Sequence, residues 1–242
     1  MFRTYNIAGL VVRMDTFGKT MSQAAKFEIM QSEAYDIEVS SSFIPFQPWE
    51  SDFPPESREY MKTGIDFYNK LLNYDGMMLH SSAVVLDGYA YLFTAASGTG
   101  KSTHTRLWCE NFDGAEILND DKPAIKLENG CWYAYGTPWS GKTDLNINKR
   151  VPLGGIAILE RDSDNSIVPL NGKRAVYAIL NQTVRPADEA RRIKVVELIS
   201  DLLENVPVWH LKCNTDNSSA ILSKEAMTGK IHNKSKDEKD EN

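Results

Sequence analysis

The pattern of apolar and polar positions predicts an α/β chain. Apolar residues recur at helical spacing over 56–72, 173–180 and 186–203, and each stretch is long enough for a helix packed along one face. Shorter apolar runs bounded by turn residues predict strands over 77–86, 89–94, 115–119, 124–127, 131–135, 155–160 and 208–211. Because helices and strands are interspersed, we expect a mixed, twisted sheet with helices packed on it.

Two turn signals indicate hairpins between these strands. Asp87-Gly88 lies between the predicted strands at 77–86 and 89–94, and Asn129-Gly130 lies between those at 124–127 and 131–135. A helix is predicted over 102–111, after the strand at 89–94 that ends the first hairpin.

The first part of the chain predicts a smaller, strand-rich unit. Weakly alternating runs at 5–14, 26–30 and 35–40 favour a small antiparallel sheet packed on the main domain. A loop rich in proline and aromatic residues follows over 43–55, and its aromatic side chains Trp49 and Phe53 either cover a pocket or pack in the core.

We therefore divide the chain into three parts. Residues 1–55 form the N-terminal strand-rich appendage, and residues 56–228 form a nucleotide-binding domain. Residues 229–242 are almost all polar and predict a disordered tail.

The segment after the first hairpin has the pattern of a phosphate-binding loop (P-loop). The strand over 89–94 runs into a turn of small residues, and a helix follows. Glycines let successive N–H groups turn inward toward phosphate oxygens at the helix N-terminus. Lys101 supplies a mobile positive charge, and Ser102 supplies a hydroxyl for Mg²⁺. The predicted nucleotide-binding residues are Ser97, Gly98, Thr99, Gly100, Lys101, Ser102 and Thr103.

One position departs from the strict P-loop pattern. Ala95 stands where the pattern has its first glycine. Alanine fits there only if the backbone avoids a positive φ.

Two adjacent carboxylates follow the next strand. Asp120 and Asp121 lie at its end, where a strand parallel to the loop strand would bring them near the γ-phosphate. One carboxylate with Ser102 and nucleotide oxygens would satisfy Mg²⁺, and the other would accept a proton from an alcohol. Mutual repulsion is expected to raise the pKa of one of the two.

Further candidates are single residues. His80 precedes the hairpin on its first strand and is either catalytic or a hydrogen-bonded core histidine. Lys142, in a turn-rich segment over 136–142, would neutralise charge on transferring oxygens or is a surface lysine. Arg150 and Arg185 are weaker phosphate-ligand candidates.

Composition narrows the class of protein. The net charge of −6 is spread along the chain, which argues against nucleic acid as a partner. Its three cysteines lack zinc or disulfide spacing. We find neither a signal peptide nor a membrane span, so we expect a cytoplasmic protein with no membrane partner.

From His80 through the loop to Asp120 and Asp121, the sequence resembles the kinase domain of HPr kinase/phosphorylase, which is related to phosphoenolpyruvate carboxykinase. The resemblance covers most of 75–215. The resemblance implies the α/β fold of that kinase domain and of phosphoenolpyruvate carboxykinase, in which the P-loop follows a β-hairpin. It also implies that Asp120 is the acid/base, that Asp121 is the Mg²⁺-side ligand, and that the protein forms homo-oligomers. The region from residue 122 onward does not show a clear HPr-docking and phosphorylase signature, so neither HPr as the substrate nor reverse phosphorolysis is indicated.

Together these features predict an ATP- and Mg²⁺-dependent kinase. Its acceptor would be a hydroxyl, with a serine of a peptide or protein as the first choice. The alternatives are a small-molecule kinase on the same fold and a nucleotide-binding regulatory protein without transfer activity.

Overall fold

The computed structural model describes residues 2–45 and 48–240, and it describes side chains there except at Trp49 and from residue 230 onward. The helices are α1 (Gly18–Ala24), α2 (Pro55–Leu71), α3 (Lys101–Asn111), α4 (Gly172–Leu180), α5 (Glu189–Asn205) and α6 (Asn217–Asp240). The strands are β1 (Arg3–Ile7), β2 (Leu10–Asp15), β3 (Ile37–Ser40), β4 (Gly76–Met78), β5 (Ser81–Leu86), β6 (Tyr89–Thr94), β7 (Glu116–Asn119), β8 (Ala124–Glu128), β9 (Cys131–Tyr135), β10 (Arg150–Arg161), β11 (Ser166–Pro169) and β12 (Val208–Cys213). None of these described helices is both long and apolar enough to cross a bilayer.

The main sheet is mixed and curled, and β10 holds its two halves together. Its order is β4-β8-β9-β10-β6-β5-β7, with β12 on β10 and β11 on β12. The first residues of β10 pair antiparallel with β9, whereas its later residues pair parallel with β6 and β12. Gly155 in β10 admits Trp209, since a Cβ there would lie 2.4 Å from the Trp209 ring. The expected mixed α/β sheet is confirmed.

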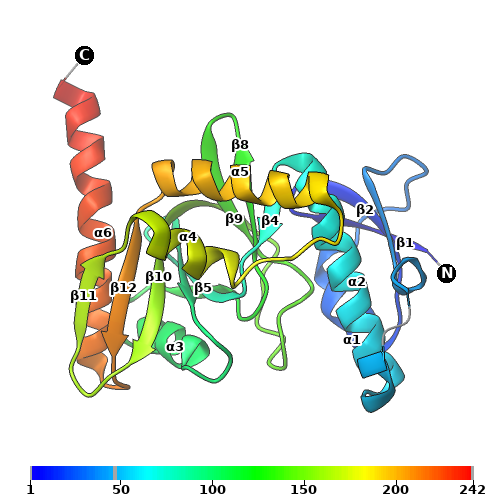
Figure 1. The fold of residues 1–242 in the computed structure, drawn as a ribbon, viewed down its shortest axis with the longest axis horizontal. Coiled ribbons are helices and arrows are strands. Elements are labelled where there is room, and N and C mark those ends of the chain that lie inside the picture. Colours follow the sequence, from blue (N-terminus) through cyan, green and yellow to red (C-terminus); the bar gives the residue numbers. More distant parts are fainter. Residues whose placement is uncertain (1, 46–47, 241–242) are drawn as a thin grey trace.

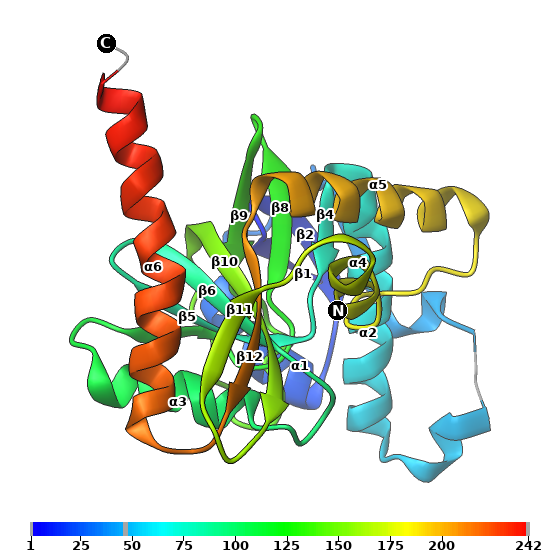
Figure 2. The same cartoon turned by 60° about the vertical axis from the view of Figure 1, so that its left-hand side comes forward.

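Helices cover both faces of this sheet (Figures 1 and 2). Alternate residues of β5 and β6 belong to two hydrophobic clusters, one shared with α4 and α5 and the other with α3 and α6. Both strands are therefore buried on both sides, which explains why they read as continuous apolar runs. The Asp87-Gly88 turn joins them with a positive φ at both residues, as a type I′ hairpin requires.

Strand β7 runs parallel to the loop strand β6, as expected for the strand that carries the two acids. It pairs antiparallel with β5, which itself pairs antiparallel with β6. It therefore runs parallel to the loop strand, one strand removed from it, and the acidic pair at its end lies at the same edge of the sheet as the loop.

Three predictions about the strands are wrong. The single strand predicted over 77–86 is divided into β4 and β5, and His80 lies between them, because β4 pairs with β8 while β5 pairs with β6 and β7. The N-terminal sheet is not purely antiparallel, since β3 pairs parallel with β2. Residues 26–30 form no strand, because a 3₁₀ turn buries Phe27 under the sheet and leaves a single bridge at Glu28.

The N-terminal sheet packs on α2 and on the end of the main sheet formed by β4, β8 and β9. Its buried residues share one cluster with Phe67, Tyr68 and Trp139. Gly64 in α2 allows this packing, since a Cβ there would lie 3.1 Å from the Trp139 ring. Figure 1 places this unit at one end of the molecule and α6 at the other. Helix α6 continues through 229–240, the part for which the polar composition predicts a disordered tail.

A buried carboxylate joins α1 to α2. Glu59 is 2 % exposed and accepts a hydrogen bond from the Thr20 hydroxyl. Burial raises the pKa of Glu59 from 4.5 to about 7, and the Thr20 bond opposes this only in part. No partner is described for the other Glu59 oxygen, Oε1.

The raised pKa of Glu59 predicts a pH-dependent stability. Between about pH 4.5 and pH 7 the unfolded chain loses this proton while the folded protein keeps it. The free energy of unfolding therefore falls through that window by a contribution on the order of 3 kcal/mol. We expect Glu59→Gln, which mimics the protonated acid, to raise the melting temperature by a few degrees at pH 8 and to leave it nearly unchanged at pH 4.5.

Thermal unfolding followed by circular dichroism at both pH values tests this expectation. Glu204→Gln, at an exposed position of α5, is the matched control and should have no effect at either pH. An equal stabilisation by Glu59→Gln at both pH values would contradict the assignment.

Candidate functional site

The loop between β6 and α3 has the backbone of a tight, glycine-dependent turn. Gly98 has a φ of 79° and Gly100 a φ of 117°. A Cβ at either position would meet nothing within 4 Å, so the backbone angle and not lack of space requires glycine. Helix α3 begins directly after Gly100, and the N–H groups of its first turn have no partner within the helix.

Ala95 fits the loop without strain. Its φ is not positive, which is the condition for an alanine at this position of the loop. Its carbonyl oxygen accepts a hydrogen bond of 3.1 Å from Lys101 Nζ. Burial lowers the pKa of Lys101, while the nearby charges of Asp121 and Asp120 oppose that change. The charges of both acids therefore act on the lysine of the loop.

Arg161 closes the outer side of the loop. Its guanidinium, at the end of β10, donates to the carbonyl oxygens of Gly98 (2.6 Å) and Thr99 (2.9 Å). Ser97 and Ser102 are exposed there, and Thr103 is half-buried. Arg161 is not marked by any pattern in the sequence, because only the parallel pairing of β10 with β6 brings it to the loop.

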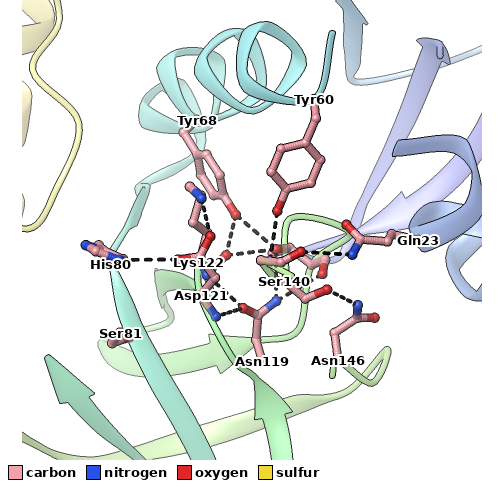
Figure 3. Close-up of polar contacts among 12 residues, drawn as sticks. Gln23, Tyr60, Tyr68, His80, Ser81, Asn119, Asp121, Lys122, Ser140 and Asn146 are labelled. Atoms are coloured by element: carbon pink, nitrogen blue, oxygen red, sulfur yellow. Dashed lines mark hydrogen bonds and ion pairs between the residues drawn. The ribbon is translucent and has the colours of Figure 1, made fainter. Parts of the chain in front are cut away.

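Asn119 shapes the turn that carries the two acids (Figure 3). It is fully buried, and its Oδ1 accepts hydrogen bonds from the backbone N–H groups of Asp121 (3.0 Å) and Lys122 (2.8 Å). Its Nδ2 donates to the Thr137 carbonyl oxygen at 3.0 Å. The two carboxylates that follow point to different partners.

Asp120 is surrounded by hydroxyl groups. Ser82 Oγ donates to Asp120 Oδ1 at 2.6 Å, and Thr143 Oγ1 donates to Oδ2 at 3.1 Å. Ser82 Oγ also lies 2.7 Å from Thr105 Oγ1 on α3. A short chain of hydroxyls thus connects the helix of the loop to the first acid.

Asp121 is held by cationic and imidazole groups. Its Oδ1 lies 3.3 Å from His80 Nε2, and Lys122 Nζ bonds to Oδ2. Burial raises the pKa of this carboxyl, but the bonds from His80 and Lys122 outweigh it and hold the pKa at about 2. Repulsion within the pair therefore does not raise the pKa of Asp121.

His80 is fixed from three sides. The ring Nδ1 lies 3.1 Å from Gln182 Oε1, and the backbone N–H of His80 donates to the Gln182 carbonyl oxygen at 2.7 Å. The backbone carbonyl oxygen of His80 accepts a hydrogen bond from the Thr94 hydroxyl. The position between β4 and β5 points the ring at Asp121, as Figure 3 shows. The sequence placed His80 beside the site and missed Gln182.

The turn around Gly141 lies against the acids. Its carbonyl oxygen accepts from Lys19 Nζ (2.5 Å) and Gln23 Nε2 (3.2 Å), and its N–H donates to the Tyr60 hydroxyl (2.9 Å). A Cβ at Gly141 would lie 3.0 Å from that of Asp121. Lys142 follows as an exposed residue. Lys19 and Gln23 were missed, since they come from α1 in the N-terminal part.

The described partners of the two candidate arginines are residues other than Asp120 and Asp121. Arg150 pairs with Glu128 at 2.8 Å and stacks over the Tyr133 ring at 3.5 Å, on the β9–β10 edge. Arg185 donates to Asn181 and lines a cavity that Lys122 also lines. The structure brings neither arginine into contact with the phosphate-binding loop.

The donor atoms at this edge suit a hard cation. They are carboxylate and hydroxyl oxygens from Asp120, Asp121 and Ser102, which is the ligand type that Mg²⁺ prefers. Among the described residues no cluster of three or more His, Cys, Asp or Glu could hold a metal on its own. A Mg²⁺ ion here would therefore need oxygens from a nucleotide and water to complete its shell.

The chain was compared with known proteins. No curated protein matches it. One solved structure with a likeness is the Hpr(Ser) kinase/phosphatase from Coxiella burnetii, at 14 % identity and a TM-score of 0.39, over 65 % of this chain and 98 % of that one. This likeness is too weak to carry an argument.

A family model matches residues 59–218, which is more than half of the chain. This family differs from the HPr kinase family that the motif residues resemble. The matched segment includes the loop, the acidic turn and His80, and it leaves out Lys19 and Gln23. The chain belongs to the family described as SynChlorMet cassette protein ScmC.

Proposed function

We propose that the protein is an ATP- and Mg²⁺-dependent kinase that transfers the γ-phosphoryl group to a hydroxyl, with a serine of a peptide or protein as the acceptor. One observation carries the proposal. A hydroxyl chain from Thr105 through Ser82 joins the helix of the glycine-dependent loop to Asp120 of the acidic turn, and the charges of both carboxylates act on Lys101.

The loop side would bind and neutralise the phosphates. Residues 97–103 offer backbone N–H groups at the start of α3, where a helix favours anions. Lys101 Nζ, now bonded to the Ala95 carbonyl oxygen, would exchange that bond for a phosphate oxygen. Lys142, exposed on the turn beside Asp121, is the second candidate to offset charge on the transferring oxygens.

The acids would divide two tasks. Asp121 stays ionised because of its pKa near 2, so it is a poor proton acceptor and suits the Mg²⁺ side with Ser102. His80 and Lys122 orient it from their side. Mg²⁺, when bound, supplies charge compensation on the β- and γ-phosphates.

Asp120 is the proposed general base. The Thr143 hydroxyl, exposed and 3.1 Å from Oδ2, occupies the place that an acceptor hydroxyl would take. The acceptor oxygen gives its proton to Asp120 and forms a bond to the γ-phosphorus. The bond between that phosphorus and the β,γ-bridging oxygen breaks, and ADP leaves with the electron pair.

Asp120→Asn tests the base. We expect phosphoryl transfer to fall by about 10²–10⁴-fold, because the amide cannot take the proton, while nucleotide affinity changes little. The measurement is transfer of label from γ-labelled ATP with Mg²⁺ to a panel of serine, nucleosides and serine-containing peptides. Asp113→Asn, at an exposed position, is the control. Full activity of Asp120→Asn would remove Asp120 from the role.

Lys101→Ala tests the phosphate site. We expect both ATP affinity and transfer to fall by at least about tenfold, since a charge-assisted bond to phosphate is lost. Calorimetric titration with ATP and Mg²⁺ measures the affinity. The control Lys173→Ala removes an exposed lysine of α4 and should bind as the wild type does. Unchanged ATP affinity in Lys101→Ala would place the phosphates elsewhere.

A further inference from the structure

A large apolar cavity lies between α2 and the segment that precedes α5. Its volume is about 620 Å³, which is within the range of ligand sites in proteins. Met61 and Ile65 of α2, Trp139 and Val184 contribute apolar walls. Phe53, the aromatic residue for which the sequence left open a role in covering a pocket, lines it and is 45 % exposed.

The cavity adjoins the acidic turn. Lys122, which bonds to Asp121, also lines the cavity. The Tyr68 hydroxyl donates to the Lys122 carbonyl oxygen, so the Tyr68 ring stands between α2 and the turn (Figure 3). On the other side, Gln182 holds His80, and Arg185 follows in the same segment and lines the cavity.

The tyrosines of the cavity present rings and not free hydroxyls. Tyr60 OH accepts from the Gly141 N–H, and Tyr68 OH bonds to Lys122 and lies 3.0 Å from Thr137 Oγ1. Burial raises the pKa of both phenols, so both stay neutral. The surface that an occupant meets is therefore aromatic and aliphatic.

The charge on the cavity has one sign. Its described lining includes the cations Lys122 and Arg185 and contains no Asp or Glu. Asp121 offsets Lys122 from outside the cavity, whereas the described bond of Arg185 goes to the neutral Asn181 amide. An occupant that combines an apolar body with a negative charge would be complementary to this lining.

Building on the proposed function, we propose that this cavity is the acceptor subsite and that it takes a peptide segment in which a bulky apolar residue and an acidic residue lie close to the phosphorylated serine. The volume exceeds what one side chain fills. Ile65 and Phe53, 40 % and 45 % exposed, leave apolar surface at the cavity, as a chain that continues out of the site would need.

Selectivity toward synthetic peptides tests the subsite. The panel consists of serine peptides with leucine or phenylalanine and aspartate near the serine, matched peptides with glutamine in place of the apolar residue, and matched peptides with lysine in place of aspartate. We expect kcat/KM of the wild-type protein to be at least about tenfold higher for the apolar, acidic peptide than for either matched peptide.

Two variants place the selectivity in the cavity. Ile65→Glu adds a carboxylate to its wall and should lower kcat/KM for the apolar, acidic peptide by about tenfold or more. Ile193→Glu, at a 53 % exposed position of α5, is the matched control and should have no effect. Arg185→Glu should reverse the charge preference, so that the lysine peptide becomes better than the aspartate peptide. Thermal unfolding of each variant checks that it is folded.

The outcomes separate the subsite from the kinase activity. Peptides labelled without regard to the apolar and acidic positions, variants with wild-type selectivity, or labelling of small molecules alone would overturn the subsite. Binding of a fluorescent apolar, acidic peptide that is weakened by Ile65→Glu, without any transfer, would support the subsite and count against the kinase proposal. Absence of both peptide labelling and peptide binding would overturn the subsite, while Asp120-dependent ATP hydrolysis would still support the kinase.

Discussion

The candidate site depends on the buried side chain of Asn119. A fully buried amide must satisfy its hydrogen-bonding groups within the protein, and this one uses both ends. The oxygen fixes the backbone of Asp121 and Lys122, and the nitrogen binds the carbonyl oxygen of Thr137. One side chain thereby sets the direction of the two acids and ties their turn to the segment that carries Gly141.

Helix α2 is the second organising element, because it faces three parts of the molecule. Glu59 joins it to α1, and Phe67 packs in the cluster of the N-terminal sheet. Tyr68 reaches the acidic turn, and Tyr60 reaches the turn at Gly141. The N-terminal part is thus linked to the site in two ways, through α2 and through Lys19 and Gln23. Its packing supports the turn beside Asp121.

The charge around the acids differs from that of the whole chain. The net charge of the protein is −6, yet Lys101, Lys122 and Lys19 all lie near Asp121. Lys122, together with the bond from His80, keeps Asp121 ionised, and Lys101 belongs to the loop where phosphates would bind. An acidic protein can therefore present a locally cationic site, because such interactions decay over distances of about 10 Å at ordinary salt.

The local structure around the loop follows from the sequence of that one stretch. The strand, the glycines, Lys101 and α3 follow from residue types within one short stretch, as do the Asp87-Gly88 hairpin and the presence of two acids after β7. Backbone angles and strand propensity are local properties, so neighbouring residues suffice to predict them.

Which distant residues meet at the loop and around the acids depends on the packing of the whole chain. Arg161 reaches it through parallel pairing, Gln182 holds His80 across a hundred residues of chain, and Lys19 arrives from the N-terminal part. The division of β4 from β5 and the opposite environments of Asp120 and Asp121 also depend on partners far along the chain. Pairing between strands that are distant in the sequence and the burial of single polar groups are set by the packing of the whole chain, and no local pattern of residues encodes them.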